Sequence, residues 1–120
     1  MTTLERFCQA VNEKDWGYRA VAVTIPDPNI NPPEKPYLFI KDRENYPRKS
    51  WATGLSDEEN AHFIIWGLDR LEELGEGPNL YTNVEGGKYS VSIASAPATQ
   101  SDSRSQAIFS ALCRVLGVEE

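Results

Sequence analysis

Residues 55–77 form the strongest pattern in the chain, because their apolar residues recur at helical spacing between a clear start and a clear end. Ser56 and Glu59 make a capping box at the start, and Gly75 provides the left-handed residue that commonly ends a helix. A helix with a broad apolar side must pack against other elements of a globular fold. With successive residues placed about 100° apart, that side spans roughly 160° and holds Phe63, Leu74, Gly67, Leu71, Ile64, Leu68 and Ala61.

The opposite side of this predicted helix is acidic. Residues 55–77 contain seven acids and one base, which gives a net charge of −6, equal to that of the whole chain. A large aromatic residue on an acidic side that should face water is typical of a surface that binds a partner. The alternative is that the monomer itself covers Trp66, with residues 26–51 or with its third helix. The predicted partner-binding residues are Glu58, Ile65, Trp66, Asp69 and Glu73.

Two further helices are predicted, one near each end of the chain. Thr2 and Glu5 make a second capping box before apolar residues at helical spacing, so a helix is predicted over residues 3–13. The third helix should begin near residues 101–102 and end at Gly117. It needs two apolar neighbours, because a second apolar set lies opposite its main one, at Phe109, Cys113 and Leu116.

Strands are predicted where β-branched and aromatic residues gather. Five prolines within residues 26–36 remove amide donors, so this segment is predicted as an extended loop outside the sheet. Residues 41–51 are polar and contain Pro47, which indicates a loop or a ragged edge strand. The predicted strands are Tyr18–Ile25, Tyr37–Ile40, and a hairpin of residues 80–84 and 88–94 that turns at Gly86-Gly87.

This order of elements predicts an α+β fold in a single domain over residues 1–120. We expect a three-layer α-β-α sandwich, in which three helices cover an antiparallel sheet of at least four strands. Four features follow from about Tyr37 onward: an aromatic strand, a helix entered by Ser56-Asp57 and Asn60-Ala61, the Gly86-Gly87 hairpin, and the run Gln106-Ala107-Ile108. In these features roughly the last two thirds of the chain resemble the phage ABA sandwich domain family. The resemblance implies the same fold and a phage or prophage origin, and it implies no activity, because the family's pattern contains no active-site residues.

Composition limits the classes of partner. A pI near 4.8 argues against direct binding to nucleic acid or to an anionic membrane, because such binding needs clustered Lys and Arg. No apolar run reaches the ~18 residues that cross a bilayer, and Glu5 and Arg6 stand where a signal peptide would be apolar. We therefore expect a cytoplasmic protein, within the host cell. Its two cysteines, Cys8 and Cys113, are expected to be reduced thiols.

No catalytic or metal-binding motif is found. His62 is the only histidine, and neither a second His nor a Cys lies at ligand spacing from it, so no metal and no catalytic role are expected there. A cysteine nucleophile would need a histidine beside it, and no serine lies in a G-x-S-x-G elbow. Gly86-Gly87 lacks the following Lys-Ser or Lys-Thr pair of a phosphate-binding loop. The sequence therefore predicts a non-enzyme without a cofactor.

Two functions are favoured by these features over the remaining alternatives, which are an enzyme and a structural or assembly role. The first is a small accessory protein that binds and blocks a host defence protein, as an anti-CRISPR inhibitor does, since a basic nucleic-acid channel would attract the acidic helix. In this hypothesis the helix contacts that basic partner or a second copy of the chain. The alternative is an oligomeric sponge that sequesters a small cyclic or nucleotide immune signal. Its ligand-binding residues would come from the basic and aromatic segment 41–51, namely Arg43, Tyr46, Arg48, Lys49 and Trp51.

Overall fold

The computed structural model describes residues 2–14, 16–26, 28–29, 34–41, 47–52, 60–83 and 86–119. Three helices lie in these ranges: α1 (Thr3–Glu13), α2 (Ala61–Glu73) and α3 (Arg104–Leu116). Thr2 caps α1 by accepting a hydrogen bond from the Glu5 N–H at 3.2 Å. Ser103 precedes α3 in the same role, and Gly117 ends α3 with a φ of 74°. The predicted boundaries of the first and third helices are thus confirmed within two or three residues.

In the described residues the strands form two antiparallel sheets of three strands each. Sheet A contains β1 (Arg19–Pro26), β2 (Glu34–Lys41) and β3 (Pro47–Ala52), with β2 in the centre. Sheet B contains β4 (Asn79–Asn83), β5 (Lys88–Ser92) and β6 (Thr99–Ser101), with β5 in the centre. The predicted hairpin is confirmed as β4 and β5.

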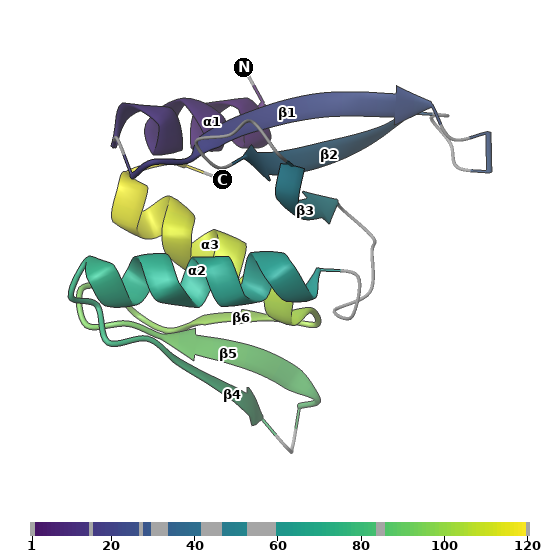
Figure 1. Cartoon of the computed structure of the whole chain (residues 1–120). Coiled ribbons are helices and arrows are strands. Elements are labelled where there is room, and N and C mark those ends of the chain that lie inside the picture. Colours follow the sequence, from purple (N-terminus) through teal and green to yellow (C-terminus); the bar gives the residue numbers. More distant parts are fainter. Residues whose placement is uncertain are drawn as a thin grey trace.

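The predicted three-layer α-β-α sandwich is wrong. Neither sheet in the described residues has four strands, and α2 and α3 lie between the two sheets rather than outside a single one (Figure 1). Sheet A precedes α2 in the chain and sheet B follows it, and α2 also separates them in space. The physical reason is that α2 has neighbours on two sides, because it packs against both α3 and β3. The fold is therefore α+β, with a central helical layer between two small sheets.

The proline-rich segment also differs from its prediction. β1 continues to Pro26 and β2 begins at Glu34, so the two ends of segment 26–36 belong to sheet A, and Pro36 lies opposite Thr24. A proline lacks the amide proton but keeps its carbonyl and a φ compatible with an extended strand. Residues 27 and 30–33 lie outside the described residues. In segment 41–51 the edge-strand alternative is confirmed for β3, whereas residues 42–46 lie outside the described residues.

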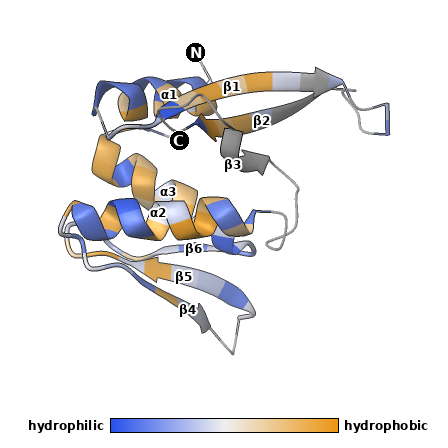
Figure 2. Cartoon of the chain, viewed as in Figure 1, coloured by the Kyte–Doolittle hydropathy of each residue, from blue (hydrophilic) through white to orange (hydrophobic). Residues whose placement is uncertain are grey.

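One core joins the layers. The inner face of sheet A contributes Leu38 and Ile40 to the same buried cluster as α1, α2 and α3. Figure 2 shows that α3, in the middle of the molecule, is largely hydrophobic. α2 and α3 approach closely at Gly67, where a Cβ atom would overlap Cγ2 of Ile108. In the described part of the chain, no helix combines the length and apolar character needed to cross a membrane.

Candidate functional site

The exposed side of α2 carries acids around an apolar centre. Ile65 is 56 % exposed, which makes it the most exposed large apolar side chain in the described residues. Asp69 follows it by four positions and Glu72 by seven, so all three lie on one side of the helix, and Glu73 adjoins them. We call Ile65, Asp69, Glu72 and Glu73 the acidic stripe. Its Ile65, Asp69 and Glu73 were predicted from the sequence to contact a partner.

Trp66 does not belong to this surface. Its side chain is 1 % exposed, so the predicted placement of Trp66 among the exposed acids is wrong. The Trp16 and Tyr18 rings meet it edge-on, with centroid distances of 6.1 and 5.9 Å, and Phe63 lies 6.0 Å away. The monomer covers Trp66, as the alternative stated, but among the described residues the rings against it come from the segment before β1 and from α2 itself, and not from residues 26–51 or the third helix. A residue enclosed in this way offers no surface to a partner.

Arg70 links this aromatic cluster to the acidic stripe. Its guanidinium carbon lies 5.0 Å from the centroid of the Tyr18 ring, in a cation–π contact. Its Nη2 atom is 3.0 Å from Oε1 of Glu73, and the two side chains are 11 % and 60 % exposed. Part of the negative charge of Glu73 is therefore balanced within the chain. Among the described residues, Asp69 and Glu72 are the acids of the stripe without such an ion pair.

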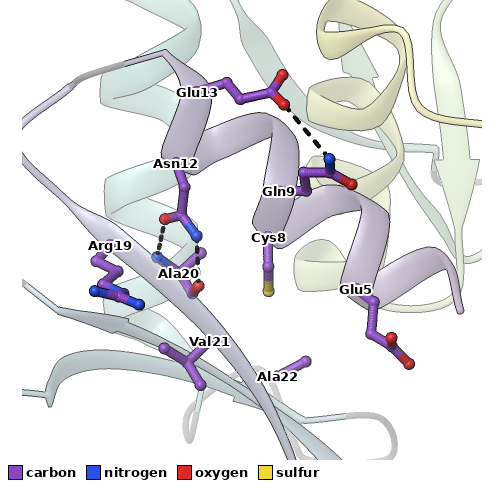
Figure 3. Close-up of a pocket in the computed structure, with 9 residues that line it drawn as sticks. All are labelled: Glu5, Cys8, Gln9, Asn12, Glu13, Arg19, Ala20, Val21 and Ala22. Atoms are coloured by element: carbon purple, nitrogen blue, oxygen red, sulfur yellow. Dashed lines mark hydrogen bonds between the residues drawn. The ribbon is translucent and has the colours of Figure 1, made fainter. Parts of the chain in front are cut away.

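A trough lies between α1 and β1 (Figure 3). It encloses about 540 Å³ and is lined by Glu5, Cys8, Gln9, Asn12, Glu13 and Arg19 to Ala22. In its wall the carboxamide of Asn12 makes two hydrogen bonds with the backbone of Ala20. Nδ2 donates to the Ala20 carbonyl at 3.1 Å, and Oδ1 accepts from the Ala20 N–H at 2.8 Å. One side chain therefore takes the place of a neighbouring strand at this residue.

The thiol in the trough is unreactive at neutral pH. Burial, together with the negative charge of Glu5, raises the pKa of Cys8 to about 11. The group is therefore protonated at pH 7 and is a poor nucleophile. Cys113 is buried in the core.

His62 is exposed on α2. The described residues contain no group of three or more His, Cys, Asp or Glu side chains that could hold a metal ion. The prediction of a non-enzyme without metal or cofactor stays a prediction.

Several predicted site residues lie outside the described part of the chain. These are Glu58 of the partner-binding set and Arg43 and Tyr46 of the ligand-binding set. The backbones of Arg48, Lys49 and Trp51 belong to β3, but their side chains are outside the described residues. The nucleotide-binding hypothesis for segment 41–51 therefore gains no geometric support.

Sheet A has an apolar outer face that was not predicted from the sequence. Val21 and Val23 of β1 lie in register with Phe39 and Tyr37 of β2, on the face turned away from the core. The Tyr37 and Phe39 rings stack at 6.1 Å, and Val23 is 36 % exposed. The outer face of an antiparallel sheet is usually polar. A signal was present, because residues 20–23 and 37–40 are apolar without the alternation of a half-exposed strand.

Comparison of the chain with protein-family models, with curated proteins and with solved structures gives no significant match. Function must therefore be argued from the chain's own residues.

Proposed function

We propose that the protein is a non-catalytic binding protein that attaches to a basic surface of a partner protein through the acidic stripe of α2. The observation that carries this proposal is Ile65, which is 56 % exposed on the acidic side of a helix whose opposite side is buried in the core. An exposed apolar side chain surrounded by charged groups has the composition of an interface centre with a polar rim.

The helix offers this stripe on a firm support. Phe63, Trp66, Gly67 and Leu71 are buried on the other sides of α2, so the helix cannot rotate or shift without breaking the core. A surface held in place before binding loses less conformational entropy when the partner arrives.

Charge supports a basic partner. The chain has a net charge of −6 at pH 7, and the acids of residues 55–77 account for this excess. Opposite charges accelerate encounter between proteins and suppress binding to acidic ones. A basic protein that itself binds nucleic acid fits this requirement, because the acids of the stripe can take the place of phosphates. The host defence protein expected from the sequence belongs to this class, and this partner would place the chain in the host-cell cytoplasm.

A capture experiment with matched variants tests the proposal. The tagged wild-type chain, an Asp69→Lys/Glu72→Lys variant and an Asp102→Lys/Glu119→Lys variant are each incubated with host-cell lysate, and retained proteins are identified by mass spectrometry. Both variants change the net charge equally, and all four acids are exposed. We expect a stoichiometric basic partner with the wild type and the second variant, and its loss with the first. Equal capture by both variants would refute a role for the stripe.

A further inference from the structure

Within the residues that the structure describes, β1 has an open hydrogen-bonding edge. It is an outer strand of sheet A and pairs with β2 on one side along its whole length. In an antiparallel pair, successive residues direct their N–H and C=O groups alternately toward the neighbouring strand and away from it. Asn12 bonds both backbone groups of Ala20, so even-numbered residues of β1 face away from β2. The next outward-facing residues are Ala22, which is half-buried, and Thr24, which is exposed.

The two ends of this edge are closed. Asn12 occupies the backbone groups of Ala20, and Pro26 has no amide proton to donate. Such devices protect an edge strand from indiscriminate pairing. Between these two closed ends, the backbone groups of Ala22 and Thr24 remain available for pairing. This stretch begins in the α1–β1 trough.

The two sides of the edge differ in chemistry. On the inner side lies α1, whose Phe7 and Val11 pack in the same core as the inner face of sheet A. This side of the trough carries Glu5, Gln9 and Glu13. The outer side continues into the apolar face of Val21, Val23, Tyr37 and Phe39.

We propose that the β1 edge binds an extended segment of a partner polypeptide, which joins sheet A as an added strand. Basic and apolar residues alternate along this partner segment. Backbone groups of the segment pair with those of Ala22 and Thr24. Side chains opposite these two residues turn toward α1, where Glu5 favours Lys or Arg. The intervening side chains extend the apolar outer face of sheet A beside Val21 and Val23. Only an extended polypeptide can satisfy a strand edge in this way. This surface is separate from the acidic stripe and does not depend on the function proposed above.

The test uses the wild-type protein and three fluorescein-labelled octapeptides in which Lys and Val alternate. The first is unmodified, the second is N-methylated at the Lys amides, and the third is N-methylated at the Val amides. Lys amides would donate to β1, whereas Val amides would point away from it. We expect the second peptide to bind at least about tenfold more weakly in fluorescence anisotropy titrations, since each lost hydrogen bond costs a few-fold to tenfold in affinity. The third should bind like the first. Equal binding by the two methylated peptides would overturn the proposal.

Protein variants give an independent readout. Thr24→Pro removes one outward amide and should weaken binding by up to about tenfold, whereas Thr24→Val keeps the amide and should leave binding unchanged. Glu5→Gln should weaken binding several-fold, and less so at high salt. Amide signals of Ala22 and Thr24 should shift when the unmodified peptide is added. Shifts confined to α2 would overturn the proposal. It would also be overturned if the chain associated with itself through the β1 edge, which would be shown by self-association that Thr24→Pro abolishes.

Discussion

Replacing Trp66 by alanine should destabilise the protein severely, although the sequence pattern put Trp66 on an exposed side. The side chain is 1 % exposed and contacts three aromatic rings. Truncating a buried Phe or Trp to Ala typically costs ~3–5 kcal/mol, because apolar burial is lost and a cavity remains. A domain of this size is expected to be stable by roughly 6–18 kcal/mol. The variant should therefore lose a large share of its stability.

Ile65→Ala is the matched control, because it changes the adjacent residue of the same helix. Ile65 is 56 % exposed, so the substitution should change stability by less than about 0.5 kcal/mol. Trp66→Phe should cost less than Trp66→Ala, since Phe fills part of the volume and the indole Nε1 has no hydrogen-bond partner among the described residues.

Urea unfolding followed by far-UV circular dichroism measures all three differences. The reasoning would be refuted if Trp66→Ala cost under about 1 kcal/mol, or if Ile65→Ala cost as much as Trp66→Ala.

Three further predictions follow from single contacts. Gly67→Ala should lower the free energy of unfolding, measured in urea titrations, by about 1–3 kcal/mol, because the new Cβ overlaps Ile108. A gain in stability would contradict the close packing of α2 on α3. Asn12→Ala should speed amide hydrogen exchange at Ala20 and cost about 1–2 kcal/mol; unchanged exchange would show that the side chain does not hold β1. The Cys8 thiol, with its pKa raised to about 11, should resist alkylation by iodoacetamide at pH 8 in the folded protein but not in urea. From pH 9 to 11 the unfolded thiol ionises before the folded one, so stability should fall as pH rises, and a Cys8→Ala variant should lack this component.

Local elements were predictable where the sequence carries a stop or start signal. The first and third helices have serine or threonine caps, and Gly117 adopts the left-handed conformation predicted for it. The second apolar side of the third helix correctly indicated a second neighbour, because Phe109 packs on Phe7 of α1 at 4.9 Å. β6 was missed because three residues are too few for a periodic pattern.

The arrangement of the elements was not predictable, because periodicity shows which side of a helix is apolar and not what covers it. Trp66 is the clearest case: a second buried side of α2 was interpreted as a binding surface, although the third helix showed the same kind of pattern and was interpreted as needing two neighbours. The same ambiguity hid the two-sheet architecture. The β1 edge could not be predicted either, since it depends on Asn12 contacting Ala20 eight residues later.

Association kinetics with the captured partner test the proposed function most directly. The association rate constant of wild type, Asp69→Lys/Glu72→Lys and Asp102→Lys/Glu119→Lys is measured by stopped flow at several salt concentrations. The acidic stripe predicts that the first variant associates at least about tenfold more slowly at low salt and loses most of its salt dependence, whereas the second stays close to wild type. Equal rates and equal salt dependence for the two variants would contradict the assignment of the partner to α2.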